Sequence, residues 1–349
     1  MARRARPACR CAALPASLSL SLRLFPSLSE AVTGPQVRQR LSARKDLELL
    51  SLGASERKDA TARAKAINAA DAVILCLPDD AAIEAASLVE ESNTNTVLID
   101  ASTAHRIDPK WVYGFPELSG EQRSRITTAK RIANPGCYAT GYISLTAPLT
   151  AAGLLKPSAS LVASAISGYS GGGKALIAAF EGEGAVHEPW GAYAFSLNHK
   201  HLPEMATFSG VAEPPIFLPA VGAFAQGMVV SVPIRYDRDL EGSAGAGGSI
   251  GAALHAALAE HYAGCQFVRV MPAGEAEWKE AGLLERGTFL RPDELNDTNA
   301  LQIFVYYNDE KGTAVLAARL DNLGKGASGA AVQNLNLALG LDEGAGLEM

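Results

Sequence analysis

A cysteine at a sharp turn is the first residue of this chain whose surroundings could do chemistry. Residues 134–141 read Asn-Pro-Gly-Cys-Tyr-Ala-Thr-Gly, and residues 142–149 are apolar enough to continue as a buried helix. Cys137 is therefore expected near a helix N-terminus, where unpaired amides and the helix dipole favour a thiolate and can hold an oxyanion. Such a thiol can attack a carbonyl and form a thioester. A buried structural cysteine is the alternative, and the rigid turn favours the nucleophile.

Two histidines supply the acid/base chemistry that a nucleophilic thiol needs. His199 and His201 are two residues apart and would share a face of an extended chain, with Glu204 just beyond them. Histidine exchanges a proton near neutral pH, and the glutamate could orient substrate or histidine. A pair of surface histidines is the alternative. No partner cluster of cysteine or histidine accompanies them, so we expect no metal site.

An arginine follows a predicted strand at the edge where an α/β sheet binds its ligands. Residues 102–106 read Ser-Thr-Ala-His-Arg and come directly after an apolar strand at residues 96–100. Arg106 is placed to hold a phosphate or a carboxylate with its forked guanidinium. Taken alone, an exposed loop arginine is the favoured interpretation.

Basic residues after an earlier strand bear on the choice of nucleotide. Arg57 and Lys58 follow the strand predicted at residues 46–52, and no acidic residue there is placed to hold a ribose 2′-hydroxyl. Basic groups at this position suit a 2′-phosphate, which favours NADP over NAD. A solvated cluster of charges on a loop is the alternative.

The first part of the chain alternates strand and helix signals. Apolar strands separated by helices are typical of parallel βαβ units, so the sequence predicts an α/β, doubly wound parallel sheet of the Rossmann type. The strands are expected at residues 46–52, 72–77 and 96–100, with helices at residues 37–41, 61–69 and from 78 onward.

The second part predicts a different sheet. Four strands with few helices between them indicate a mixed or antiparallel sheet with one helical layer, at residues 227–236, 267–271, 301–307 and 314–320. A glycine-rich segment at residues 167–174 lacks P-loop spacing, so nucleotide hydrolysis is excluded. A loop is expected at residues 241–251, and a glycine turn at residues 321–329 leads into a C-terminal helix at residues 330–341.

Residues 1–33 form an atypical leader, rich in arginine, serine and leucine and without an acidic residue before Glu30. They could be an organelle transit peptide, a disordered tail or a wrongly assigned gene start. The first strand of the sheet is therefore expected to be atypical or missing, and only residues 18–25 could provide it.

Bulk composition limits the possible partners. The chain has 349 residues, 48% of them hydrophobic, a formal net charge of −6 and five cysteines. The negative charge argues against a nucleic-acid partner, and no apolar run approaches the roughly 20 residues of a membrane helix. An odd number of unpatterned cysteines suits reduced thiols.

Five motifs in order resemble the short form of the N-acetyl-γ-glutamyl-phosphate reductase family. They lie at residues 102–106, 134–141, 167–174, 199–204 and 321–326. The family reduces an acyl phosphate to an aldehyde with NADPH in arginine biosynthesis, so the resemblance implies a small-molecule acyl-phosphate substrate. It also implies a Rossmann-type domain (residues 34–136 plus 322–349) and an α+β catalytic and oligomerisation domain (residues 137–321). A homo-oligomer, dimer or tetramer, is expected in the cytoplasm, or in a mitochondrion or plastid if the leader is a transit peptide.

The resemblance assigns roles by position. Cys137 matches the nucleophile and His199 or His201 the acid/base. Attack by Cys137 would form a thioester and release phosphate towards Arg106, and NADPH would then transfer a hydride to the thioester. The candidate substrate-binding residues are Arg106, Ser167, Gly168, Tyr193, Glu204 and Gln226, and the candidate cofactor-binding residues are Gly34, Arg57, Lys58, Asn322, Gly324, Lys325 and Gly326.

One departure and two rivals remain. Of the family's glycine turn after the first strand only Gly34 has a counterpart, and Ala31 stands where the family has glycine, so weak NADPH binding is expected. Aspartate-semialdehyde dehydrogenase shares this chemistry and is the rival enzyme, although residues 199–204 fit it less well. A non-catalytic homologue is the other rival, and tight NADPH binding would exclude it.

Overall fold

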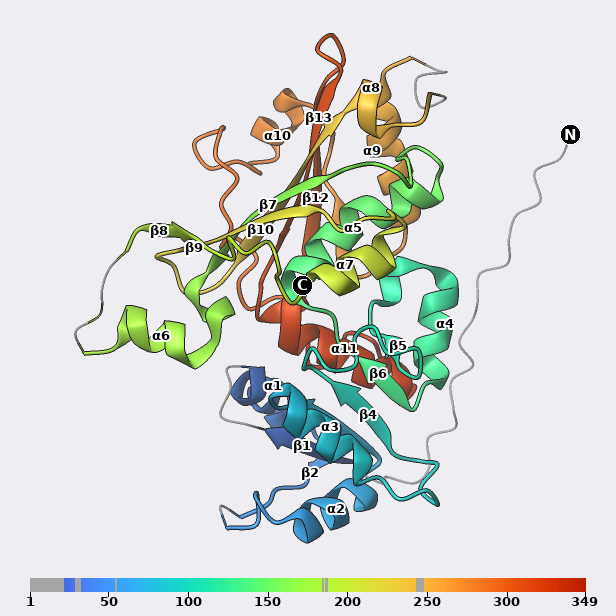
Figure 1. Ribbon diagram of the computed structural model, residues 1–349, viewed down its shortest axis with the longest axis vertical. Helices are drawn as coiled ribbons and strands as arrows, with labels where there is room; N and C mark the ends of the chain where they lie inside the picture. The colour runs from blue at the N-terminus through green and yellow to red at the C-terminus, as the bar shows by residue number, and fades with distance from the viewer. Residues whose placement is uncertain (1–21, 29–32, 54, 184, 186–187, 243–247) are drawn as a thin grey trace, which may run out of the picture.

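Two β-sheets organise the part of the chain that the structure describes (Figure 1). The structure is a computed structural model, and it describes residues 22–28, 33–53, 55–183, 185, 188–242 and 248–349. The middle of the loop expected at residues 241–251 therefore lies outside the described residues, as does most of the expected leader.

The first sheet has six strands, all parallel, in the order β2-β1-β3-β4-β6-β5. Every residue of β3 and β4 is buried, and all but Asp100 are apolar, as expected for a sheet covered by helices on each side. The strands and helices of this part are β1 (Leu22–Leu28), α1 (Thr33–Ser42), β2 (Leu47–Leu49), α2 (Ala60–Ala69), β3 (Ala72–Cys76), α3 (Asp79–Ser87), β4 (Val97–Asp100), β5 (Val112–Tyr113), η1 (Pro116–Leu118), α4 (Gly120–Thr128) and β6 (Arg131–Ala133).

The first strand of this sheet comes from the expected leader. Strand β1 pairs in parallel with β2 through Leu22 and with β3 through Leu24 to Leu28, so it lies inside the sheet. Leu24 and Phe25 are buried in the cores on the two faces of the sheet. The first strand is therefore present and comes from residues 22–28, which overlap the segment 18–25 that the sequence offered for it, and the sheet begins before the expected boundary at residue 34.

The second sheet has seven strands in the order β11-β12-β13-β10-β7-β9-β8. Only β11 with β12 and β7 with β9 run parallel, which makes it a mixed sheet. Its elements, with the helices around it, are α5 (Cys137–Ala151), β7 (Val162–Gly168), η2 (Tyr169–Gly172), α6 (Gly173–Glu181), β8 (Trp190–Ala192), α7 (Leu202–Ser209), β9 (Ile216–Gly222), β10 (Met228–Arg235), α8 (Tyr236–Asp239), α9 (Ile250–His261), β11 (Val268–Val270), α10 (Glu275–Glu280), β12 (Leu301–Asn308) and β13 (Thr313–Leu320).

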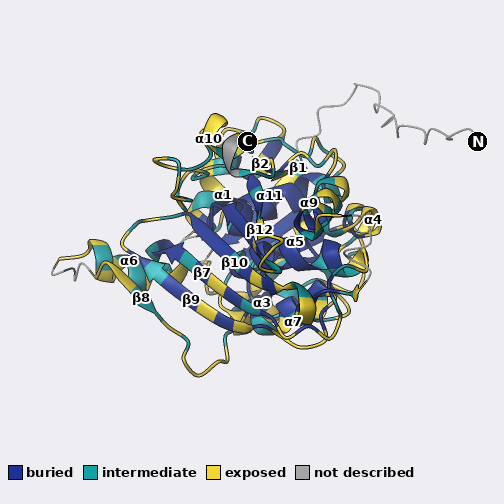
Figure 2. Cartoon of the chain, turned by 90° about the horizontal axis from the view of Figure 1, so that it is seen from above, coloured by how far each residue is buried: buried dark blue, intermediate teal, exposed yellow. Residues whose placement is uncertain are grey.

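One layer of helices covers this sheet. Helices α5, α7 and α9 bury the residues of one face in the largest hydrophobic cluster, to which Tyr142, Leu258 and Leu316 belong. On the other face a strip along β8 and β9 stays uncovered, and exposed residues alternate with buried ones along β9 (Figure 2). Ile216 and Leu218 are two of these exposed residues.

The C-terminal elements return to the first sheet. The π-turn η4 (Gly324–Ser328) leads into helix α11 (Gly329–Ala338), and Ala331, Val332 and Leu335 complete a core cluster with Leu24 of β1. The structure therefore confirms the α/β fold class, with a parallel doubly wound sheet and a second, α+β part. Strands β8 and β9 were not expected from the sequence.

Candidate active site

Cys137 is the first residue of helix α5, as the Pro-Gly turn predicts. Gly136 caps the helix in an extended conformation, and the backbone N–H of Thr140 donates to its carbonyl at 2.8 Å. The thiol is only partly buried. It therefore lies at the positive end of a 15-residue helix and is open to a pocket.

Three functional side chains converge on Gly136. A Cβ atom built there would lie 2.5 Å from Nη1 of Arg106, 2.5 Å from Nε2 of His201 and 2.6 Å from Oε1 of Glu204. No side chain fits in that space, which explains the glycine. The same crowding brings the guanidinium and the imidazole beside the residue that carries the thiol.

Glu204 is a buried carboxylate with three donors. It accepts hydrogen bonds from Nη1 of Arg106 at 2.7 Å, from the Tyr113 hydroxyl at 2.8 Å and from the Gly136 backbone N–H at 3.1 Å. Both of its oxygens are engaged within the protein. Glu204 thus supports the site from within the protein, where it fixes Arg106 and the turn at Gly136. This geometry does not favour the direct contact with substrate that the sequence predicted.

Glu204→Ala is expected to lower the free energy of unfolding by about 3–5 kcal/mol, because it leaves Arg106 buried without its partner. Urea denaturation measures the change, with Glu213→Ala, at an exposed position, as the matched control. A loss below about 1 kcal/mol together with a raised substrate KM would return Glu204 to a substrate-binding role.

The two histidines lie together, but not in an extended chain. His201 has helical backbone angles and caps helix α7, and its backbone N–H donates to Nδ1 of His199 at 3.1 Å. The two rings meet edge to face with centroids 4.8 Å apart, and the Tyr138 and Phe217 rings pack around them. The sequence predicted correctly that the two rings lie together, but it was wrong to expect an extended backbone between them. A turn brings the rings together instead.

Burial and positive charge keep both imidazoles neutral. Desolvation, with Lys200 and Arg106 nearby, lowers the pKa of His199 to about 4, and it lowers the pKa of fully buried His201 well below its usual value. Nδ1 of His201 is buried without a hydrogen-bond partner among the described residues. Both rings are thus neutral at pH 7, so each keeps one ring nitrogen without a proton.

The thiol differs from the sequence expectation. Burial raises the pKa of Cys137, and the positive charge of Arg106 and the Tyr138 backbone N–H oppose this shift only in part. The helix N-terminus alone therefore does not make a thiolate in the unliganded protein. A neighbouring base must take the proton, and the neutral histidines are in place to do so.

The pocket beside Cys137 has a volume of about 200 Å³. Of the candidate residues, it is lined by Arg106, Cys137, Tyr193, His199, His201, Asn322 and Gly326. Ser167, Gly168, Gln226, Gly324 and Lys325 are not among its lining residues. Lys200 and Tyr138 also line it, although the sequence had not singled them out.

Two of the residues outside the pocket have other partners. The hydroxyl of buried Ser167 donates to the carbonyl of Gly168, beside a strand pair of the second sheet. Gln226 is bonded at the surface to Asp297, at 2.9 Å. The backbone N–H of Gly227, the next residue, donates instead to Asn322 at 2.7 Å and so fixes one wall of the pocket.

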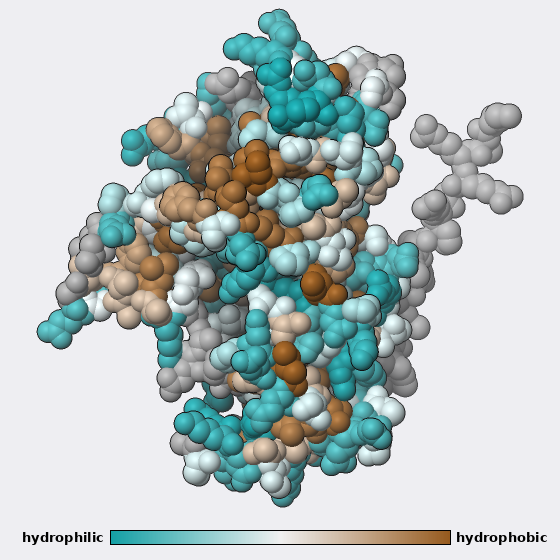
Figure 3. All heavy atoms as spheres, in the orientation of Figure 1, coloured by the Kyte–Doolittle hydropathy of each residue, from teal (hydrophilic) through white to brown (hydrophobic). Residues whose placement is uncertain are grey.

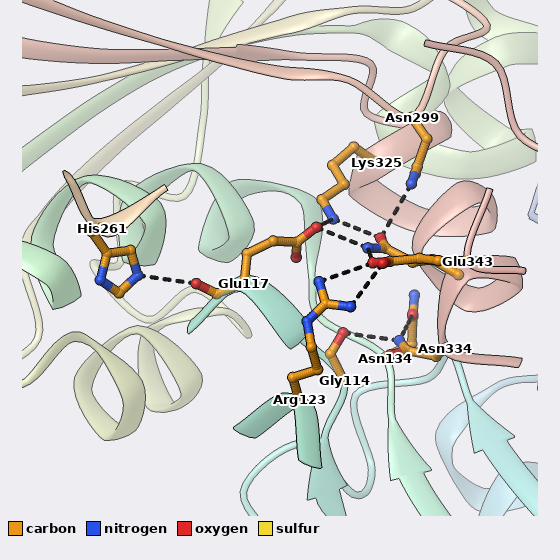
Figure 4. A network of polar contacts seen from close by, with 10 residues as sticks. Gly114, Glu117, Arg123, Asn134, His261, Asn299, Lys325, Asn334 and Glu343 are labelled. Carbon is orange, nitrogen blue, oxygen red and sulfur yellow. Dashed lines mark hydrogen bonds and ion pairs between the residues drawn. The ribbon is translucent and has the colours of Figure 1, made fainter. Parts of the chain in front are cut away.

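Lys325 turns away from the pocket into a buried polar network (Figure 4). Its ammonium group donates to Oε1 of Glu117 and to Oε1 of Gln333, both at 2.7 Å. Gln333 and Arg123 also bind Glu343, near the C-terminus. The expected cofactor contact of Lys325 is thus replaced by a structural one, while Gly326 stays at the thiol, where a Cβ would lie 2.7 Å from Cβ of Cys137.

A cationic pocket opens beyond the carboxyl ends of β1 and β3. The strand order reverses between these strands, which is where doubly wound sheets bind nucleotides. Phe25, Pro26 and Ser27 form one wall, so the end of β1 does reach this site. Four cationic residues and no acidic one are among its described lining residues, and the four are Arg38, Arg57, Arg63 and Lys174.

The candidate cofactor residues divide at this pocket. Arg57 lines it, Lys58 does not, and Gly34 is buried in helix α1 behind Pro35. The sequence did not identify Arg38 and Arg63 as candidates. Each lies on a helix, and the sequence does not show which side of that helix faces the pocket. The rest of the segment that matches the family's glycine turn includes residues 29–32, which lie outside the described residues.

The described residues form neither a metal-binding cluster nor a membrane-spanning helix. No group of three or more histidine, cysteine, aspartate or glutamate side chains there could hold a metal ion. None of the helices described is both long and apolar enough to cross a membrane.

Comparison with known proteins identifies the chain. Family models match at residues 30–126 (semialdehyde dehydrogenase, NAD binding domain) and 137–322 (semialdehyde dehydrogenase, dimerisation domain). N-acetyl-gamma-glutamyl-phosphate reductase of Trichormus variabilis is 48% identical over 93% of this chain and 99% of its own length. The protein of that name from Chelativorans is 44% identical over 92% and 99%. The chain belongs to the N-acetyl-γ-glutamyl-phosphate reductase family.

Solved structures add the fold. Aspartate semialdehyde dehydrogenase II of Vibrio cholerae, complexed with ASA, matches with a TM-score of 0.63 at 14% identity, over 92% of this chain and 98% of that one. The aspartate semialdehyde dehydrogenase of Candida albicans, with NADP, matches with a TM-score of 0.57 at 11% identity, over 90% and 98%. The protein is thus an oxidoreductase of the semialdehyde dehydrogenase fold, and the prediction of a nicotinamide-binding domain is confirmed.

Proposed function

We propose that the protein reduces N-acetyl-γ-glutamyl phosphate to N-acetylglutamate semialdehyde with NADPH, releasing phosphate, as a step of arginine biosynthesis. The observation that carries this proposal is the Cys137 thiol at the start of α5, in one pocket with Arg106 and two neutral histidines. The reductase names of the relatives at 44% and 48% identity support the choice of substrate over aspartyl compounds.

The first step is the attack of Cys137 on the acyl-phosphate carbonyl. Neutral His201, whose Nε2 lies over Gly136, accepts the thiol proton as the sulfur–carbon bond forms. The phosphate leaves beside the Arg106 guanidinium, which is held in orientation by Glu204 and by the Asn134 carbonyl. A thioester on Cys137 remains.

The second step converts the thioester to an aldehyde, for which the reduced nicotinamide supplies the hydride. The backbone amides at the start of α5 are placed to stabilise the negative oxygen that develops on the former carbonyl. His201 then returns its proton to the Cys137 sulfur as the carbon–sulfur bond breaks, because burial and the charge of Arg106 lower the pKa of the protonated ring. Collapse of the adduct frees the aldehyde and the thiol.

The cationic pocket fits NADPH rather than NADH. Arg57 lies beyond β2, where the adenosine ribose is held in this type of sheet, and Arg38 and Arg63 line the same pocket. Guanidinium groups bind phosphate oxygens in pairs, and no carboxylate among the described lining residues would repel a 2′-phosphate. The weak NADPH binding expected from the incomplete glycine turn stays a prediction, because residues 29–32 lie outside the described residues, although strand β1 before them is in place.

Arg106→Lys is expected to raise the KM for the acyl phosphate about tenfold, because lysine keeps the charge but loses the fork that Glu204 and the Asn134 carbonyl hold in place. Steady-state kinetics with varied substrate measures it, with exposed Arg235→Lys as the control. An unchanged KM and kcat would remove Arg106 from the phosphate site.

The decisive experiment is an assay in the reverse direction. Purified protein is given NADP, phosphate and either N-acetylglutamate semialdehyde or aspartate semialdehyde, and NADPH formation is followed by absorbance. We expect turnover with the acetylated substrate and at least a hundredfold lower kcat/KM, about 2.7 kcal/mol, with the other. The opposite preference would make the protein an aspartate-semialdehyde dehydrogenase, and no turnover with tight substrate binding would make it a non-catalytic homologue.

Assembly as a homo-oligomer belongs to the same proposal. Trp190 of β8 and Ile216 and Leu218 of β9 are exposed on the uncovered sheet face, and hydrophobic atoms gather over the seven-stranded sheet in Figure 3. Burying such a strip against a second copy would remove it from water. The family model for residues 137–322 is described as a dimerisation domain. The cytoplasmic location, with mitochondrion or plastid as its alternative, stays a prediction.

A further inference from the structure

One cation of the nucleotide pocket comes from the other sheet's part of the chain. The pocket, of about 380 Å³, is lined by residues between Phe25 and Leu77 and, in addition, by Lys174. Lys174 is the second residue of helix α6, which follows strand β7 of the seven-stranded sheet. The pocket thus bridges the two halves of the molecule at this one side chain.

Helix α6 is attached to the rest of the protein mainly through its base, the turn η2 (Tyr169–Gly172) that directly precedes it. None of its residues is buried, and Figures 1 and 2 both show it projecting from the side of the molecule. The Tyr169 ring stacks on Phe180 with centroids 4.8 Å apart, and its hydroxyl donates to Glu181 at 2.8 Å. Gly173, where the helix begins, has a φ of +73°, a conformation that favours glycine. Contacts outside this base are therefore what would fix the helix in place.

The base of α6 also forms part of the catalytic pocket. Gly171 and Gly173 line the pocket beside Cys137, and the Ser170 hydroxyl accepts from the Asn322 amide at 3.0 Å. A second cavity, of about 730 Å³, continues from there along α6 and is lined by Leu176 and Phe180 together with Tyr193 and His199. A contact that holds Lys174 in place therefore also holds a segment that lines the pocket of the reacting thiol.

We propose that Lys174 binds a phosphate group of NADPH and that this contact holds α6 against the active site. The inference rests on the proposed function. A lysine ammonium binds phosphate as a point charge, and it needs no fixed fork to do so from a helix that can adjust. Arg38, Arg57 and Arg63 hold the nucleotide on its own sheet, whereas Lys174 ties it to the walls of the acyl-substrate site. Cofactor occupancy and the shape of that site become linked.

Nucleotide titration of the full chain tests the contact. We expect Lys174→Ala to weaken NADPH binding tenfold or more, about 1.4 kcal/mol, and Lys174→Arg to stay within about threefold of the parent. The control is Lys65→Ala, which removes the same charge from an exposed position on α2 outside the pocket and should change nothing. Weakening for NADPH alone assigns the contact to the 2′-phosphate, and equal weakening for NADH assigns it to the pyrophosphate.

Hydrogen exchange tests the link to α6. Amides of residues 173–181 should gain protection when the parent is saturated with NADPH and gain none in saturated Lys174→Ala, whose KM for the acyl phosphate should also rise. Parent-like NADPH affinity in Lys174→Ala would overturn the contact while leaving the proposed function intact. Weakened binding with parent-like protection of α6 would overturn the link. A parent chain that binds neither nucleotide would overturn this inference and the proposed function together.

Discussion

Cys137→Ser is expected to abolish turnover and to leave the fold intact. Oxygen replaces sulfur at the first residue of α5 with little change of shape, so packing against Gly326 is kept. A serine hydroxyl has no comparable anionic form near neutral pH, and the loss of a covalent nucleophile typically lowers kcat on the order of 10⁴-fold or more. The reverse assay measures kcat, and NADPH titration verifies that the cofactor still binds.

A second thiol provides the matched control. Cys265 is also a free, partly buried cysteine, but it borders a different cavity, next to Gln266 and Arg123. Cys265→Ser should keep parent-like kinetics. Mass spectrometry adds an independent readout, since the parent mixed with acyl phosphate and no nucleotide should carry an acyl group that Cys137→Ser lacks. Activity of Cys137→Ser within tenfold of the parent would end its assignment as nucleophile.

His201→Ala is expected to lower kcat by about 10²–10⁴-fold, and His199→Ala by much less. His201 has its Nε2 next to Gly136 and lines one pocket with Cys137, so it is the ring placed to exchange a proton with the thiol. His199 accepts a hydrogen bond at Nδ1 from the His201 backbone, which leaves its proton on Nε2 and gives it a donor's role at the pocket.

The pH profile separates proton transfer from a loss of packing. Because burial lowers the pKa of His199 to about 4 and that of His201 well below its usual value, both rings are neutral between pH 6 and 8. The parent's kcat/KM should therefore show no acid limb near pH 6.5, and the limb should lie well below that pH. A limb near pH 6.5 that disappears in His201→Ala, or equal small losses in both variants, would contradict these roles.

Local chemistry explains what the sequence could predict. The Pro-Gly pair fixes the turn before Cys137 through its own backbone limits, and the apolar run of β3 reads as a buried strand because both of its faces are covered. Arg106 follows strand β4 at the ligand-binding edge, as the sequence predicts, and it shares a pocket with Cys137 because the carboxyl ends of parallel strands β4 and β6 meet at that edge.

Contacts between distant residues explain what it could not. Arg106 and Glu204 are 98 positions apart, so their ion pair, which turns an expected substrate ligand into a support, has no local signature. The ammonium of Lys325 likewise finds Glu117 across 208 positions. Strand β1 was obscured by Arg23 and Pro26 in a leader-like composition, and β9 by exposed Ile216 and Leu218, whose face has no helical layer to cover it.

The return of helix α11 to the first sheet fixes when an active molecule can exist during synthesis. The core around Leu24 of β1 is closed only when Ala331 and Leu335 have been made, so an early strand depends on residues synthesised about 300 positions later. The turn that packs Gly326 against Cys137 is made in the same late segment. A nascent chain thus carries its nucleophile for most of translation without a finished pocket around it, and a prematurely terminated product lacks both the sealed nucleotide domain and the shaped cysteine site.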